Sequence, residues 1–110
     1  MIERKQFRRI LLKLSGEALA GGEGFGLNPQ ILKYIAQEIA EVHALGVQVA
    51  VVVGGGNFVR GETFSVAGGI DRTVADQMGM LGNLMNALGL QSAIEKAGVQ
   101  TRVQSAIAIS

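Results

Sequence analysis

The sequence contains no cysteine and no tryptophan, and only one proline and one histidine among its 110 residues. Without cysteine it can form no disulfide framework, and a single histidine, His43, cannot supply a Cys/His zinc cluster. No apolar run approaches the roughly 20 residues needed to cross a bilayer, and the start of the chain lacks the apolar length of a secretory signal. We therefore expect a soluble, cytoplasmic protein with no membrane partner and no cysteine chemistry.

Charged residues are also few, at 17% of the chain. The ten basic residues nearly balance the nine acidic ones, which gives a formal net charge of +1. Such a balance provides no global field for nucleic acid or an anionic membrane. The basic residues gather at the start, however, where residues 1–13 carry five basic and one acidic side chain. An RNA-contacting or non-catalytic nucleotide-sensing module is therefore the alternative hypothesis, and a salt-dependent affinity for nucleic acid would favour it. We do not expect a nucleic-acid partner.

Apolar segments alternate with amphipathic ones along the chain. Residues 7–15, 47–53 and 99–109 have the composition of strands, and the second of them is apolar enough to be covered on both faces. A helix is predicted from Asn28-Pro29 to Gly46 and another over 71–97. Strands joined by helical crossovers favour a three-layer α/β/α sandwich with a mainly parallel sheet. Because the order stops after a third strand, we expect residues 1–110 to be the N-terminal part of a single larger domain.

Glycine, with 16 copies, is abundant. Five of the eleven residues in 16–26 are glycine, which predicts a loop. Gly79, Gly82 and Gly89 fall inside the second predicted helix, where each costs about 1 kcal/mol relative to alanine. They indicate a break, a kink or the close approach of another backbone at this helix.

Two glycine-containing segments stand at the ends of the first two predicted strands. We call residues 13–17 (KLSGE) the first glycine turn and residues 54–61 (GGGNFVRG) the second glycine turn. Loops at the carboxyl ends of parallel strands form the usual ligand site of such sheets. Because glycine has no Cβ, consecutive backbone amides can approach a phosphate directly. The two turns therefore predict a phosphate-binding site, and tight turns without a ligand are the alternative.

Four charged side chains lie within these turns or after them. Lys13 lies near the end of an apolar strand, where it either extends to solvent at a sheet edge or neutralises a bound anion. Arg60, four residues after the glycines, is either a surface arginine or a bidentate phosphate donor. Asp76 is either a solvated carboxylate or an acceptor for sugar hydroxyls, and Asp71 is expected to be a helix N-cap.

The common nucleotide and hydrolase fingerprints are absent. Neither glycine turn contains the P-loop pattern, and no stretch matches the dinucleotide or nucleophile-elbow patterns. A phosphate site with one lysine and one arginine suits phosphoryl transfer, in which catalysis is mostly positioning and neutralisation of negative charge.

Several of these segments together resemble a known family. They are Ile10–Leu19 (ILLKLSGEAL), Gly24–Gly26, Val53–Asn57 with Arg60-Gly61, Asp76–Leu81 (DQMGML) and Asn86. In combination they are similar to the uridylate kinases of the amino acid kinase family, from about Phe7 to Ile107. The resemblance implies transfer of the γ-phosphoryl group of ATP to UMP with Mg²⁺, in a cytoplasmic homohexamer of pyrimidine nucleotide biosynthesis that GTP activates and UTP inhibits. Family members continue for about as many residues again, so the resemblance implies a chain that is inactive alone.

The same resemblance implies a role for individual residues. It assigns the ATP phosphates to Lys13, Leu14, Ser15, Gly16, Gly56 and Arg60, with Lys13 as the catalytic residue that neutralises the transferred group. It assigns UMP to Gly55 and to Asp76, which would hold the ribose. It assigns activation by GTP to the loop Gly21, Gly22, Glu23, Gly24, Phe25 and Gly26. No residue is assigned to a metal.

Overall fold

The computed structural model describes residues 9–59 and 69–105. Its elements are β1 (Arg9–Leu14), α1 (Gly16–Ala20), the 3-10 helix η1 (Gly21–Glu23), α2 (Pro29–Ala44), β2 (Gln48–Val53) and α4 (Arg72–Lys96). The two strands and two long helices predicted within the described residues are therefore confirmed, with small differences at their ends.

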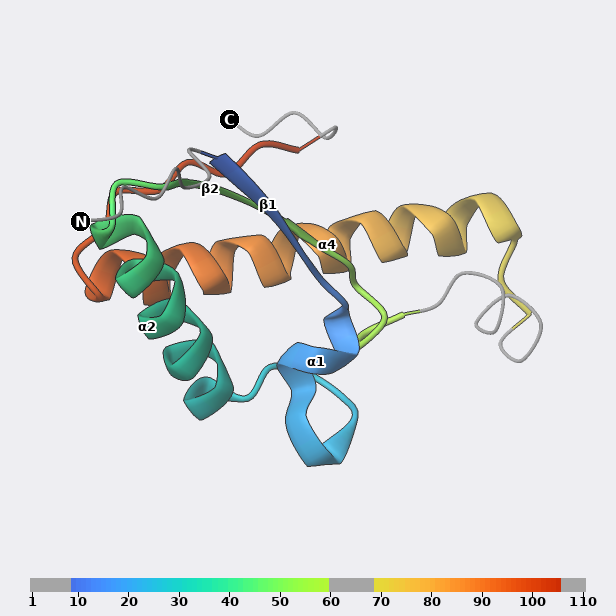
Figure 1. Cartoon of the computed structure of the whole chain (residues 1–110). Helices are drawn as coiled ribbons and strands as arrows, with labels where there is room; N and C mark the ends of the chain where they lie inside the picture. The colour runs from blue at the N-terminus through green and yellow to red at the C-terminus, as the bar shows by residue number, and fades with distance from the viewer. Residues whose placement is uncertain (1–8, 60–68, 106–110) are drawn as a thin grey trace, which may run out of the picture.

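The strands β1 and β2 pair in parallel, with Arg9 opposite Gln48 and Leu14 opposite Val53. Every second side chain of each strand points to the same side, where α2 and α4 lie together (Figure 1). The core on this side consists of Ala36, Ile39, Leu90 and Ile94 with half-buried strand residues packed around them. The alternation of apolar side chains along a strand thus fixes which face of the sheet the helices cover.

The opposite face of the sheet is open. Leu11 and Val52 point to it and are 64% and 51% exposed. The described residues therefore form two layers of the predicted three, and β2 is covered on one face instead of two. An apolar strand face of this kind is normally covered in an α/β protein, so the described part of the chain contains the sheet and one helical layer of the sandwich.

Residues 16–26 are not the irregular loop that their glycine content predicted. The Ser15 hydroxyl accepts a hydrogen bond from the backbone N–H of Ala18 at 3.2 Å and caps α1. The sequence Glu-Ala-Leu-Ala that follows is rich in good helix formers. Gly21 and Gly24, with φ of 72° and 75°, then end α1 and η1 in conformations that favour glycine.

The long helices begin and end close to the predicted residues. Asn28 accepts hydrogen bonds from the backbone N–H groups of Gln30 and Ile31 and so caps α2, and Gly46 follows its end at φ 89°. Helix α4 runs without interruption through its glycines. Asp71 occupies its N-cap position, as predicted, but makes no capping hydrogen bond through its side chain.

The predicted third strand is wrong for residues 99–105, which form no ladder, while residues 106–109 lie outside the described ranges. The side chains from Val99 to Gln104 alternate between half-buried and exposed, as in a strand. One backbone carbonyl of the segment is held by α4 instead, because Gln91 Nε2 donates to the Thr101 oxygen at 3.0 Å. The side chains of this segment thus alternate as in a strand, but its described hydrogen bonds to the rest of the chain join it to α4 and not to β2.

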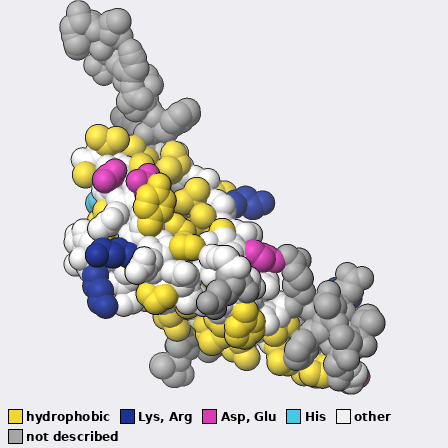
Figure 2. Space-filling view, turned by 90° about the horizontal axis from the view of Figure 1, so that it is seen from below, with side chains coloured by type: hydrophobic (Ala, Val, Ile, Leu, Met, Phe, Trp, Pro, Cys, Tyr) yellow, Lys and Arg dark blue, Asp and Glu magenta, His cyan; other side chains and the backbone are white. Residues whose placement is uncertain are grey.

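Much apolar surface remains at the exterior, as the space-filling view from below shows (Figure 2). On α4 the exposed apolar residues Val74, Leu81, Met85 and Leu88 follow helical spacing and are 44–50% exposed. Contiguous patches of this kind mark interaction surfaces. Within the described ranges, no helix combines the length and apolarity that a bilayer-spanning segment requires.

Candidate phosphate-binding site

The two glycine turns are in direct contact at the carboxyl ends of β1 and β2. The Gly54 N–H donates to the Leu14 oxygen at 3.0 Å, which extends the strand pairing by one bond. A Cβ added to Gly16 would lie 2.7 Å from the Gly56 nitrogen. A side chain at position 16 would therefore push the second turn away from the first. The predicted adjacency of the turns is confirmed.

The second glycine turn is confined from two further sides. A Cβ at Gly55 would lie 2.7 Å from Asn83 Oδ1 and 2.8 Å from the Gly79 oxygen, both on α4. A Cβ at Gly56 would lie 2.6 Å from Oε2 of Glu17, on α1. Gly55 is thus required by the close approach of backbone atoms of α4, whereas a Cβ at Gly56 would meet the end of the flexible Glu17 side chain and one at Gly54 would make only an ordinary contact of 3.6 Å.

Lys13 lies one residue before the end of β1, opposite Val52, with an exposed side chain on the open sheet face. This position leaves its ammonium group accessible beside the first glycine turn. Arg9 lies on the same face four residues earlier, where its Nε donates to Gln48 Oε1 at 2.6 Å. The two basic residues share a strand and a face, but only Lys13 adjoins the turn.

Leu14 and Ser15 connect β1 to α1 and act mainly through the backbone and the cap. The Leu14 side chain packs toward the helices, and its carbonyl accepts from Gly54. The Ser15 hydroxyl caps α1, whose first residue is the buried Gly16. The free backbone N–H groups at the start of a helix favour a nearby anion. Helix α1 has only five residues, so this contribution is small.

Asp76 lies on α4 toward the second glycine turn. It shares a helix face with Gly79 and Asn83, which contact Gly55, and lies about 10 Å from Asn83 along the axis. Its Oδ1 forms an ion pair with Arg72 Nε at 3.1 Å, and the two side chains are 55% and 60% exposed. Asp76 therefore lies on the same face of α4 as the residues that contact Gly55, some distance from the glycines, in an exposed pair that contributes little to stability.

Sequence reasoning missed the role of Asn57 and Asn86, whose side chains join α4, the second glycine turn and Gly26. Their amides form two hydrogen bonds with each other, of 2.7 and 3.0 Å, and both side chains are buried. The signal was available in α4, where Asn86 stands on the buried face between Gly82 and Leu90, a position that an amphipathic helix normally fills with an apolar residue.

The loop to which the resemblance assigns GTP, residues 21–26, contacts the second glycine turn. Gly26 and Asn57 are joined by a backbone hydrogen bond of 3.0 Å, and Asn57 Nδ2 donates to the Gly26 oxygen at 2.8 Å. The rings of Phe25 and Phe58 meet edge to face with centroids 5.8 Å apart. A change in the conformation of this loop would therefore alter its contacts with the second glycine turn.

One expected residue of the site has no described counterpart. Arg60 lies outside the described residues. Within the described ranges, no group of three acidic, histidine or cysteine side chains could hold a metal ion.

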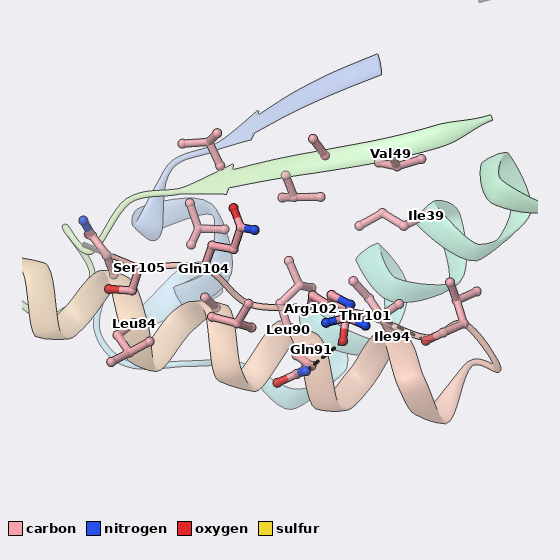
Figure 3. A pocket seen from close by; sticks show the side chains of 18 of the residues that line it. Ile39, Val49, Leu84, Leu90, Gln91, Ile94, Thr101, Arg102, Gln104 and Ser105 are labelled. Carbon is pink, nitrogen blue, oxygen red and sulfur yellow. Dashed lines mark hydrogen bonds between the residues drawn. The ribbon is translucent and has the colours of Figure 1, made fainter. Parts of the chain in front are cut away.

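A cavity in the described part of the chain lies elsewhere. It measures about 780 Å³ and lies between β2, α4 and the segment 99–105, with Leu90, Ile94, Thr101 and Arg102 among its lining residues (Figure 3). Its lining includes neither glycine turn. This cavity is therefore not the candidate site.

A parallel sheet with helices packed on it defines a protein of the α/β class. The family model described as "Amino acid kinase family" matches residues 8–109, and the chain belongs to this family. Over 102 residues the chain is 58% identical to a uridylate kinase from Limosilactobacillus reuteri (strain DSM 20016) and 54% identical to one from Pediococcus pentosaceus. Each alignment covers 93% of this chain but 42% of the relative.

Solved structures give the same result. The crystal structure of UMP kinase from Ureaplasma parvum matches with a TM-score of 0.84 and 32% identity, over 94% of this chain and 45% of that one. The crystal structure of UMP kinase from Bacillus anthracis matches with a TM-score of 0.75 and 41% identity, over 84% of this chain and 37% of that one. These likenesses confirm the amino acid kinase fold, of which the chain spans less than half.

Proposed function

We propose that this chain is the N-terminal part of a UMP kinase, which transfers the γ-phosphoryl group of ATP to UMP and yields UDP and ADP. The observation that carries the proposal is the contact between the two glycine turns, because it brings two sets of backbone amides to one edge of the sheet. The similar proteins, which are named uridylate kinase or UMP kinase, agree with this activity.

The residues at this edge suit the chemistry. A phosphate oxygen of UMP attacks the γ-phosphorus of ATP while the bond to the β-γ bridging oxygen breaks, so negative charge spreads over the transferred group. Gly55 and Gly56 are adjacent, with Cα atoms about 3.8 Å apart, and their amides would bind UMP and ATP respectively. The Lys13 ammonium would neutralise the transferred group, with Leu14 to Gly16 and Arg60 on the ATP phosphates. Mg²⁺, held largely by phosphates and water, would supply further charge neutralisation.

The proposed reaction can be tested on a complete chain, meaning these 110 residues joined to the remaining portion of the L. reuteri uridylate kinase. With ATP and Mg²⁺ we expect phosphorylation of UMP, measured as ADP release in a coupled assay, and at least a hundredfold lower kcat/KM with AMP or GMP. Salt-dependent RNA binding without turnover would instead favour the alternative hypothesis of a nucleic-acid or nucleotide-sensing module.

Asp76 provides a prediction specific to UMP. In the complete chain, Asp76→Asn is expected to raise the KM for UMP about tenfold and to leave the KM for ATP within about twofold, because a carboxylate accepts stronger hydrogen bonds from ribose hydroxyls than an amide does. Arg72→Gln is the control, since it removes the same ion pair without removing the carboxylate. Equal effects of the two variants on the KM for UMP would contradict the assignment.

We further propose that the complete protein assembles as a homohexamer in the cytoplasm, with GTP as activator at residues 21–26 and UTP as inhibitor. The exposed apolar residues of α4 support self-association. The hydrogen bonds between Gly26 and Asn57 support regulation, because they connect the activator loop to the second glycine turn.

A further inference from the structure

The amide pair Asn57–Asn86 lies buried beneath the second glycine turn. Asn57 is 1% and Asn86 0% exposed, and they are the polar side chains that the described residues bury most completely. Each amide uses both of its N–H groups. One of each bonds to the partner amide, and the others donate to the Gly26 oxygen at 2.8 Å and the Gly54 oxygen at 2.6 Å.

Packing alone does not require such a pair. Buried polar groups are costly unless every donor is satisfied, and two apolar side chains of similar volume would fill the same space. What the amides add is direction, because a hydrogen bond fixes the orientation of the carbonyl that accepts it. The two carbonyls held in this way belong to the second glycine turn and to the loop 24–26.

The bond to Gly54 has a direct consequence for the candidate site. The Gly54 carbonyl and the Gly55 N–H belong to one planar peptide unit, and in a trans peptide they point in opposite directions. Asn86 draws the Gly54 oxygen toward α4. The Gly55 N–H must therefore point away from Asn86, which determines where an anion can meet it.

We propose that Asn57 and Asn86 are positioning residues: their amide pair sets the orientation of the Gly54–Gly55 peptide, and through Gly26 it connects this peptide to the loop 24–26. Neither side chain contacts a reacting group. The inference rests on the proposed function, because it assigns the oriented N–H to the acceptor phosphate.

The test compares Asn86→Asp with Leu90→Ala in the complete chain. Aspartate is nearly isosteric, and its ionised carboxylate cannot donate to the Gly54 oxygen. Leu90, one turn further along the buried face of α4, belongs to the core cluster away from the turn, so its loss lowers stability only. At a temperature where both variants are folded by circular dichroism, Asn86→Asp is expected to lower kcat/KM for UMP about 10-fold to 100-fold. Leu90→Ala is expected to stay within about twofold of the parent chain.

Hydrogen exchange measured by mass spectrometry gives a second result, independent of activity. Asn86→Asp is expected to accelerate exchange in peptides covering 54–59, and Leu90→Ala is not. Should Asn86→Asp not fold, Asn57→Ser replaces it and is expected to accelerate exchange in 24–28 as well as 54–59. Equal behaviour of the asparagine variant and Leu90→Ala in both measurements would overturn the inference.

The two proposals can fail separately. If the parent chain does not phosphorylate UMP, the proposed function is wrong, and exchange alone decides whether the amide pair holds the turn. If the parent chain is active but the asparagine variants match Leu90→Ala, the function stands and the positioning role is rejected.

Discussion

Lys13→Ala in the complete chain is expected to lower kcat for UMP phosphorylation about 10³-fold while the fold is retained. Lys13 lies on the open face of the sheet, where its side chain contributes little to the core. Removing it therefore removes charge neutralisation at the transferred group and little packing. Steady-state kinetics with saturating UMP and ATP measure the loss, and circular dichroism with thermal unfolding verifies the fold.

Arg9→Ala is the matched control for this experiment. Arg9 occupies the same strand and the same face as Lys13, carries the same charge, and lies at the other end of β1. Its loss breaks one exposed hydrogen bond to Gln48 and is expected to leave kcat within about twofold. Near-normal turnover in Lys13→Ala, or an equal loss in Arg9→Ala, would reject Lys13 as the neutralising residue.

The elements that the sequence predicted well are those with strong local signals. Helix α2 combines an asparagine cap, a proline at its first position and a terminal glycine, all of which act within a few residues. Residues 16–26 failed as a prediction because their glycine content was weighed above the helix formers between the glycines. The third strand failed for another reason: a strand requires a paired neighbour, and the hydrogen bonds of a segment are not determined by its own alternation.

The candidate site, too, has one feature that the sequence predicted and one that it did not. The contact between the two glycine turns followed from the rule that parallel strands end at one edge, and the structure confirms it. The amide pair could not be deduced, because Asn57 and Asn86 are 29 residues apart and meet only when α4 packs beneath the turn. What the structure adds is a cause for two of the glycines: Gly16 and Gly55 are required by close backbone approach, in addition to any bound phosphate.

The close approach of α4 to Gly55 predicts a large effect of a substitution there on stability. Gly55→Ala in the complete chain is expected to lower the free energy of unfolding by about 3 kcal/mol, and Tm by about 10 °C. The new Cβ would lie 2.8 Å from the Asn83 nitrogen and the Gly79 oxygen, which are backbone atoms of α4 that cannot rotate away. Either the helix or the turn must move. Because the turn carries the proposed amides, kcat/KM for UMP is expected to fall as well.

Gly79→Ala supplies the comparison from the other side of the same contact. A Cβ there would lie 3.9 Å from the Val59 oxygen, an ordinary van der Waals distance, and alanine favours a helix interior by about 1 kcal/mol over glycine. This variant is therefore expected to unfold at an equal or higher temperature than the parent chain. If Gly55→Ala were as stable as Gly79→Ala, the turn would not be held against α4 as the structure shows, and the geometry of the candidate site would be wrong.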